Sequence, residues 1–313
     1  MKDQVNAGKF HDPETTAAGA QRARVRLESP RTLWFNTGTL CNIECRNCYI
    51  LSSPSNDALV YLCEAEVTDY LDQIQEAQWP VREIGFTGGE PYMNPEMPAL
   101  IERALERGYE VLVLTNAMQP LMRPRVQKAL VALNARYGDR LTHRVSVDHW
   151  TAEGHDAVRG KGSFDLTLKG MRWLGAEGFR ITLAGRSLWR ETEAEARRHY
   201  GDLIAAHGFD IDPLNPAETV IFPEIDETVE VPEISTDCWG ILGKSPSDVM
   251  CASSRMVVKR RGADTPSVVA CTLLPYDPRF DLGRTLREAE AEVALNHPNC
   301  AKFCVLGGAS CSG

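Results

Sequence analysis

The stretch TLCNIECRNCY, residues 39–49, brings three cysteines, Cys41, Cys45 and Cys48, onto one short segment. It follows an apolar run, TLWFN at 32–36, that predicts a β-strand. Three thiolates on one loop can hold an iron–sulfur cluster, whereas a tetrahedral structural zinc ion would lack its fourth ligand. The segment therefore indicates a cluster with one open iron at the end of a strand. A zinc knuckle is the alternative.

Strand-like runs alternate with amphipathic helical stretches from this point onward. The further predicted strands cover 82–86, 109–115, 143–148, 179–185 and 219–222, and the predicted helices cover 56–77, 97–107, 123–136, 164–177 and 191–207. Strands that alternate with helices indicate a parallel α/β sheet with right-handed crossovers, either doubly wound or a partial barrel. Ligands of such folds bind at the carboxyl ends of the strands.

The pattern changes after about residue 228. RMVVKR at 255–260 and SVVACTL at 267–273 flank a turn and predict a hairpin, and a stretch rich in Glu and Ala predicts a helix over 284–295. We therefore expect a polar leader over 1–30, a barrel over 31–228 and a small α+β domain over 229–313.

Composition narrows the class of protein. The net charge is -9, and the basic residues are scattered rather than gathered in the stripe that binds nucleic acid. The amino terminus has no signal-peptide pattern, and no run of about 18 apolar residues occurs. Ten cysteines in a reducing compartment indicate metal or redox chemistry. We expect a soluble cytoplasmic protein with neither nucleic acid nor membrane as a partner.

Polar motifs follow the later strands at their carboxyl ends. Glycines permit close backbone approach, and a carboxylate suits an ammonium group. GFTGGEP at 85–91 carries Gly88, Gly89, Glu90 and Pro91, LTNAM at 114–118 carries Asn116, SVDHW at 146–150 carries Ser146 and Asp148, and HDAVRGKGSFD at 155–165 carries Arg159.

In order and position these segments resemble the radical S-adenosylmethionine (radical SAM) superfamily over about residues 33–190, including the aromatic Tyr49 after the third cysteine. The resemblance implies a partial (β/α)6 barrel of the TIM type. It also implies that Cys41, Cys45 and Cys48 hold a 4Fe-4S cluster. The GGEP segment would receive the amino group of S-adenosylmethionine, and Asn116 would lie near its ribose. Ser146 and Arg159 would meet its carboxylate, and Asp148 its ribose hydroxyls or the substrate.

The resemblance implies an activity as well. The reduced cluster gives an electron to S-adenosylmethionine, and the resulting 5′-deoxyadenosyl radical abstracts hydrogen from a substrate. A flavodoxin- or ferredoxin-type reductant would supply the electron. The protein itself contributes orientation and the exclusion of water.

A second group of cysteines, Cys251, Cys271, Cys300 and Cys304, lies in the last quarter of the chain. Four thiolates can ligate a complete auxiliary 4Fe-4S cluster, and they suit a structural zinc ion equally well. The arrangement resembles the twitch relative of the SPASM extension, although CxxxC stands here where CxxC is usual. Cys311 and then Cys238 are the next candidate ligands.

The expected function is dehydrogenation or epimerisation of a small polar metabolite. An auxiliary cluster could accept an electron from the substrate radical or bind substrate at an open iron, and Cys238 or Cys311 could return a hydrogen atom. Peptide maturation is the alternative among enzymes. A non-catalytic iron–sulfur carrier or sensor is the alternative of another class.

Several other residues carry weaker signals. Cys63 lies in an apolar pattern that indicates core, and His149 and His155 indicate structural hydrogen bonding more than proton transfer. Arg186 and Arg190 lie at and beyond the end of a predicted strand, where one of them could pair with a carboxylate of the cofactor or substrate. Exposure to solvent is the alternative for both. Glu224, Asp226 and Glu233 lie near the last barrel strand and the domain boundary, where they could bind substrate. The alternative is that they belong to a solvated linker.

Overall fold

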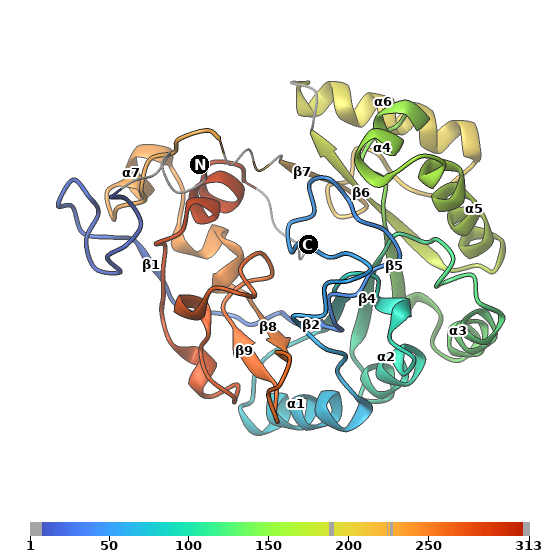
Figure 1. Cartoon of the computed structure of the whole chain (residues 1–313), viewed down its shortest axis with the longest axis horizontal. Coiled ribbons are helices and arrows are strands. Elements are labelled where there is room, and N and C mark those ends of the chain that lie inside the picture. The colour runs from blue at the N-terminus through green and yellow to red at the C-terminus, as the bar shows by residue number, and fades with distance from the viewer. Residues whose placement is uncertain (1–7, 188–190, 224, 226–227, 309–313) are drawn as a thin grey trace.

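A parallel sheet surrounded by helices forms the larger part of the computed structural model, which describes residues 8–187, 191–223, 225 and 228–308 (Figure 1). Its strands are β2 (Thr32–Asn36), β3 (Glu83–Thr87), β4 (Glu110–Thr115), β5 (Leu141–Ser146), β6 (Arg180–Ser187) and β7 (Thr219–Pro223). Each pairs in parallel with the next, as in a partial (β/α)6 barrel. The predicted α/β fold is confirmed.

The helices cover the outer side of this sheet. They are α1 (Glu64–Glu76), α2 (Met97–Glu106), α3 (Pro124–Tyr137), α4 (Ala152–Arg159), α5 (Ser163–Ala176) and α6 (Glu193–His207). Their apolar faces and the outward-facing strand residues form one continuous core, in which Leu33, Ile84 and Val113 are fully buried. Burial on both faces explains why the strands are nearly continuous apolar runs.

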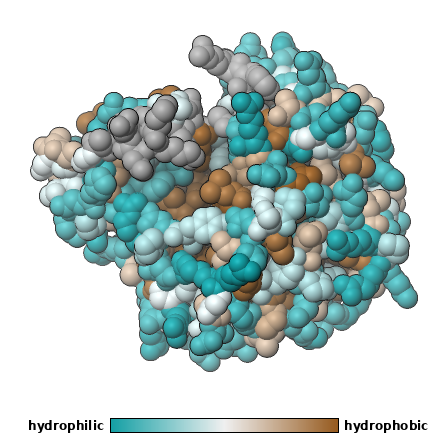
Figure 2. Space-filling model, in the orientation of Figure 1, coloured by the Kyte–Doolittle hydropathy of each residue, from teal (hydrophilic) through white to brown (hydrophobic). Residues whose placement is uncertain are grey.

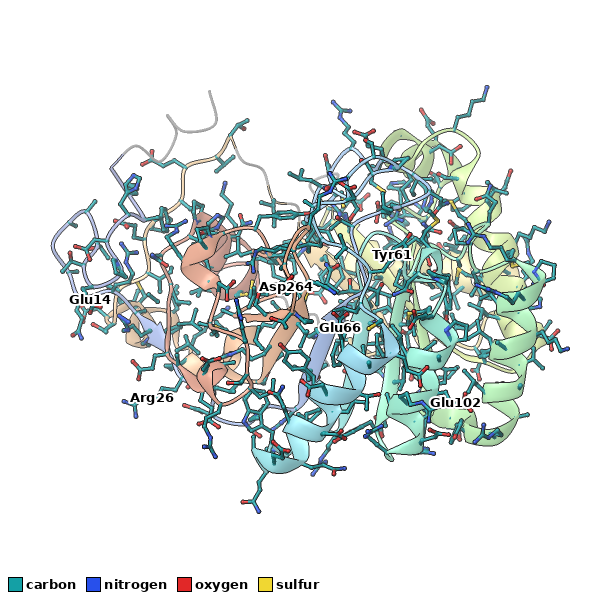
Figure 3. The ribbon with its side chains drawn as sticks, turned by 60° about the horizontal axis from the view of Figure 1, so that its bottom comes forward. Glu14, Arg26, Tyr61, Glu66, Glu102 and Asp264 are labelled. Carbon is teal, nitrogen blue, oxygen red and sulfur yellow. The ribbon has the colours of Figure 1, made fainter. Side chains whose placement is uncertain are left out.

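The predicted start of the first helix, residue 56, is wrong, because α1 begins at Glu64. Leu59 instead forms a bridge with Arg260, so the apolar spacing there reflects burial beneath the carboxyl-terminal hairpin. The Cys63 N–H donates to the Glu66 carboxylate, which starts the helix and also pairs with Lys259. Figure 3 labels Glu66, on α1, and Asp264, which lies in the turn of the hairpin.

The predicted hairpin is confirmed as β8 (Ser254–Val258) and β9 (Ser267–Val269), which pair in antiparallel register. β8 also pairs in parallel with β2, so that the sheet has the order β7-β6-β5-β4-β3-β2-β8-β9. The carboxyl-terminal region therefore extends the barrel sheet.

The predicted helix over 284–295 is wrong. This stretch holds only a 3₁₀ turn, Glu288–Glu290, and the short strand β10 (Val293–Ala294), which pairs with β1 (Arg24–Val25). The buried Arg255 side chain donates hydrogen bonds to the carbonyls of Ala289 and Ala291, which a regular helix would need for itself. Tertiary contacts thus override the helix propensity of Glu and Ala.

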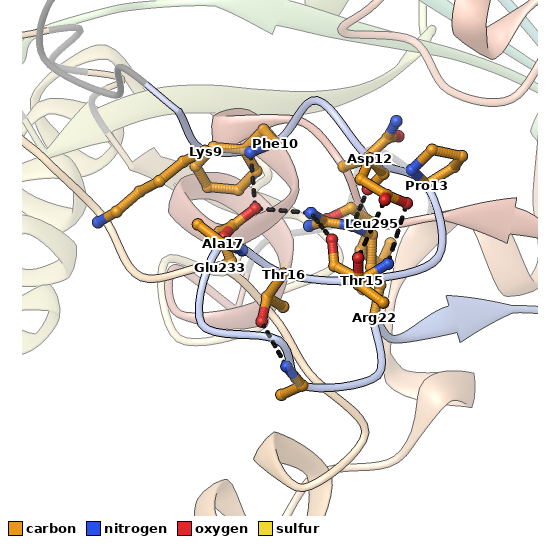
Figure 4. Close-up of polar contacts among 12 residues, drawn as sticks. Lys9, Phe10, Asp12, Pro13, Thr15, Thr16, Ala17, Arg22, Glu233 and Leu295 are labelled. Carbon is orange, nitrogen blue, oxygen red and sulfur yellow. Dashed lines mark hydrogen bonds and ion pairs between the residues drawn. The ribbon is translucent and has the colours of Figure 1, made fainter.

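The described part of the amino-terminal stretch packs against this carboxyl-terminal region. The Glu233 carboxylate accepts hydrogen bonds from the N–H groups of Phe10 and Ala17 and from Arg22 Nη2, each at 2.6 Å (Figure 4). Arg22 also donates to the carbonyls of Asp12 and Thr15. The Glu233 carboxylate therefore binds the amino-terminal stretch and has a structural role.

A second core lies inside the barrel and beneath the carboxyl-terminal region, and it includes Trp34, Met256 and Phe303. Figure 2 shows apolar side chains in a hollow near the middle of one face, bordered by polar surface. Among the described residues, no helix is both long and apolar enough to cross a membrane.

Candidate active site

A pocket lies at the carboxyl ends of the barrel strands and collects most of the residues that the sequence singles out. Its lining includes Cys41, Cys45, Cys48, Tyr49, Gly88, Gly89, Asn116, Ser146, Asp148 and Arg159. These residues come from loops after four different strands and from the end of α4. The parallel sheet brings them together because its strands all end on the same side.

Backbone hydrogen bonds hold the cysteine loop against its neighbours. The Cys41 N–H donates to the Ser53 carbonyl at 3.1 Å, and the Arg46 N–H donates to the Val158 carbonyl at 2.9 Å. Burial raises the pKa of Cys41 to about 12 and also raises the pKa of Cys45. Both thiols therefore carry their proton at neutral pH when no cation is bound, and a bound metal ion would displace it.

The Gly88–Gly89 turn packs directly on the cysteine loop. Gly88 has a φ of +146°, and a Cβ there would lie 2.5 Å from the Gly38 carbonyl oxygen. A Cβ on Gly89 would lie 2.2 Å from the Leu40 carbonyl oxygen. Only glycine permits this approach, so the two loops form one wall of the pocket.

Glu90 and Pro91 lie behind this wall and do not line the pocket. The Glu90 carboxylate accepts hydrogen bonds from Thr115 Oγ1 at 2.8 Å and from the N–H groups of Asn116 at 2.8 Å and Tyr92 at 3.2 Å. Burial raises the pKa of Glu90 to about 7, although these hydrogen bonds oppose the shift. Pro91 begins a buried 3₁₀ turn, Pro91–Met93.

Asp148 and Arg159 form a buried ion pair beside the cysteines. Arg159 Nε lies 2.8 Å from Asp148 Oδ2, and Arg159 Nη2 lies 3.0 Å from Oδ1. Arg186 Nε is 3.6 Å from the same carboxylate. Burial alone would raise the pKa of Asp148, but the two guanidinium groups outweigh it and hold the pKa below its usual value.

Tyr49 is fixed between the sheet edge and Arg186. Its hydroxyl donates to the Pro223 carbonyl at 2.8 Å, and its ring meets Phe222 and Phe303 edge-on. The Arg186 guanidinium carbon lies 4.2 Å from the ring centroid, which is a cation–π contact. Arg186, near the carboxyl end of β6, therefore belongs to the pocket.

The sequence missed several apolar and small lining residues. Ala184, Gly185, Phe222, Thr272 and Leu273 all line the pocket. Strand-end position signals the first three, whereas Thr272 and Leu273 come from beyond β9 and reach the pocket only because the hairpin joins the barrel sheet.

The second group of cysteines lines a separate, apolar cavity, which we call the rear cavity. Cys251, Cys271, Cys300 and Cys304 all contribute to it. Burial raises the pKa of Cys251 to about 11. Cys238 begins α7 (Cys238–Leu242) and is not among the described lining residues of either cavity, and Cys311 lies outside the described residues.

Both groups of thiols gather around a cavity. Three thiols line the pocket and four line the rear cavity. In the parts of the chain that the structure describes, no three His, Cys, Asp or Glu side chains are grouped so as to hold one metal ion.

The remaining candidates have structural surroundings. His149 Nδ1 lies 2.8 Å from Thr151 Oγ1, at the start of α4. His155 is fully buried edge-on against Phe164, and its two ring nitrogens have no hydrogen-bond partner among the described residues, so the structural hydrogen bonding expected of it is wrong. Cys63 is half-buried at the N-cap of α1, so its expected place in the core is wrong as well. Arg190, Glu224 and Asp226 lie outside the described residues.

A family model described as the radical SAM superfamily matches residues 35–203, more than half of the chain. Mycofactocin maturase MftC of Mycobacterium tuberculosis (strain CDC 1551 / Oshkosh) is 31% identical over 153 residues, which cover 49% of this chain and 36% of MftC. Antilisterial bacteriocin subtilosin biosynthesis protein AlbA of Bacillus subtilis (strain 168) is 31% identical over 145 residues, which cover 46% of this chain and 30% of AlbA. The matched stretch thus spans about a third of these curated relatives.

Among solved structures, Streptococcus suis SuiB bound to precursor peptide SuiA superposes with a TM-score of 0.59. Its sequence is 12% identical, and the superposition covers 90% of this chain and 71% of SuiB. At this identity the likeness shows a shared fold.

Proposed function

The chain belongs to the radical SAM superfamily, and from this premise we propose that it removes hydrogen from a peptide substrate bound at the pocket. A 4Fe-4S cluster with S-adenosylmethionine supplies the 5′-deoxyadenosyl radical for that chemistry. The observation that carries the proposal is the gathering of Cys41, Cys45 and Cys48 with the Gly88–Gly89 turn and Arg159 around one pocket.

The chain's own residues have distinct tasks in this proposal. The three cysteines hold the cluster, and the backbone of Gly88 and Gly89 allows the methionine part of the cofactor to approach. Asn116 and Ser146 offer polar contacts, and Arg159 offers positive charge for the cofactor carboxylate. Apolar side chains of the lining, such as Phe222 and Leu273, help to exclude solvent and dissolved hydrogen donors from the pocket.

Relatives favour a peptide over the small polar metabolite that the sequence alone favoured. SuiB binds a precursor peptide, AlbA serves the biosynthesis of a bacteriocin, and MftC is a maturase. The pocket lies beside the sheet edge at β7, where Phe222 and Tyr49 provide apolar surface for side chains of a peptide.

We also propose that Cys251, Cys271, Cys300 and Cys304 hold an auxiliary 4Fe-4S cluster. Their position around one apolar cavity supports a shared metal site, and the resemblance of the arrangement to the auxiliary-cluster extensions of this superfamily supports a cluster. With four thiolate ligands such a cluster has no open iron and suits electron transfer.

Metal analysis tests both sites together. The anaerobically reconstituted wild type should hold about eight irons per chain, and the Cys41→Ala, Cys45→Ala, Cys48→Ala variant about four. A Cys251→Ala, Cys300→Ala variant should also hold about four and still bind S-adenosylmethionine, whereas Cys63→Ala should match the wild type. About four irons in the wild type, with zinc retained, would refute the auxiliary cluster.

Turnover assays test the substrate class. Reduced enzyme is incubated with S-adenosylmethionine and with peptides encoded by short reading frames beside its gene, and peptide mass and 5′-deoxyadenosine are measured. A peptide that loses hydrogen in proportion to 5′-deoxyadenosine supports the proposal. Turnover only with sugars or other small polar metabolites would restore the other candidate, and failure to bind S-adenosylmethionine would refute both.

A further inference from the structure

The pocket and the rear cavity share a wall. The pocket is lined by Thr272 and Leu273, and the rear cavity by Cys271, Leu273 and Leu274. Among the residues that the structure describes, Leu273 is the one that lines both. The two cavities therefore adjoin at Leu273, which borders both of them.

Local geometry holds this side chain in place. The Leu273 N–H donates to Cys271 Sγ at 3.2 Å, which ties the backbone of the wall to a rear thiol. The Thr272 hydroxyl donates to Met250 Sδ at 3.6 Å, next to Cys251. Leu273 itself is only 6% exposed, and it packs in the core beneath the carboxyl-terminal region.

We propose that Leu273 is a partition that keeps the occupant of the pocket, and water, away from the rear cysteines. It is a positioning residue, because it sets how close a substrate can come to them without supplying a reacting group. This inference rests on the proposed function, since it concerns a substrate in the pocket and metal at the rear site. It implies that substrate approaches the rear site without ligating it.

Truncation should open the partition, because side chains around a Leu→Ala cavity relax only in part. Leu274 is the matched control, since it is also 6% exposed and lines the rear cavity but not the pocket. Leu273→Met is the conservative variant, because methionine has a similar volume.

The experiment measures access to the rear site in the reconstituted enzyme. Bathophenanthroline disulfonate removes iron anaerobically while N-ethylmaleimide labels the freed thiols, and mass spectrometry locates the labels. Loss from the rear cysteines is thereby separated from loss at Cys41, Cys45 and Cys48. Each variant is measured with and without saturating S-adenosylmethionine, which fills the pocket.

Leu273→Ala should speed labelling of Cys251 and Cys271 about tenfold, equivalent to lowering the barrier by about 1.4 kcal/mol. S-adenosylmethionine should return the rate close to that of the wild type. Leu274→Ala should show no protection by S-adenosylmethionine, and Leu273→Met should match the wild type. Labelling of Leu273→Ala no faster than Leu274→Ala, or insensitive to S-adenosylmethionine, would overturn the partition.

Failure of the proposed auxiliary cluster gives a different result. The rear cysteines of the wild type would then be labelled at a rate that the chelator does not change, whereas labelling of Cys41, Cys45 and Cys48 would still require it. The direct labelling rates of the wild type, Leu273→Ala and Leu274→Ala would still decide whether the partition exists. Leu273→Val serves in the same comparison if the alanine variant loads no iron.

Discussion

Arg159 binds both oxygens of the Asp148 carboxylate, and the pair is almost completely buried beside the cysteine loop. The two residues come from different segments, since Asp148 follows β5 and Arg159 ends α4. Their pairing therefore fixes the helix relative to the sheet, and with it the wall of the pocket.

Removing the carboxylate should destabilise the protein strongly. Asp148→Ala leaves Arg159 and Arg186 facing each other without their shared anion, so we expect the free energy of unfolding to fall by about 3 kcal/mol. Urea denaturation of the metal-free chain measures this. The control is Glu193→Ala, which breaks the more exposed pair with Arg197 and should cost under about 0.5 kcal/mol. Equal losses would contradict the buried pair's role.

Glu90 should make stability depend on pH. Its pKa is raised by burial from 4.5 to about 7, so the folded state binds a proton that the unfolded state has released between these values. The contribution of Glu90 to the free energy of unfolding is therefore greatest below about pH 4.5. It is lost as the pH rises from there through 7, by about 3 kcal/mol in total.

The variant Glu90→Gln carries no titrating proton and should lose that dependence. Denaturation at pH 5 and pH 8 measures it, and the wild type should lose more stability than Glu90→Gln between the two. Identical pH profiles for the two proteins would show that Glu90 stays ionised throughout.

Gly89→Ala should disturb the cysteine loop while leaving the barrel folded. The added Cβ would meet the Leu40 carbonyl, next to Cys41, at a distance that forces the loop to move. We expect iron at Cys41, Cys45 and Cys48 to be lost, with circular dichroism unchanged. Gly175→Ala on α5 meets only an ordinary 3.7 Å contact with Ile181 and should keep its iron. Full iron loading of Gly89→Ala would refute this constraint.

Arg22→Ala should release the amino-terminal stretch. It removes one partner of a buried pair and leaves the Glu233 charge without its guanidinium, at a cost of about 3–5 kcal/mol. Limited proteolysis should then cut within residues 8–21 faster than in the wild type. Arg24→Ala breaks a more exposed pair with Glu14 and should change the cutting rate little. Similar rates in both variants would show that other contacts hold the stretch.

The sequence by itself determined the order and position of the barrel strands and the site residues that follow them. β2 matches its predicted run, and Cys41, Asn116 and Ser146 all reach the pocket. Local pattern suffices there, because parallel strands buried on both faces are apolar runs and their carboxyl ends meet at one edge.

Only the tertiary structure decided which distant segments meet. It joined β8 to β2, made a strand and turn of 284–295, committed Glu233 to Arg22 and set Leu273 between the two cavities. Each of these depends on contacts between residues far apart in the chain. Local propensity carries no information about such contacts, because burial and hydrogen bonding with the partner segment supply the energy that selects them.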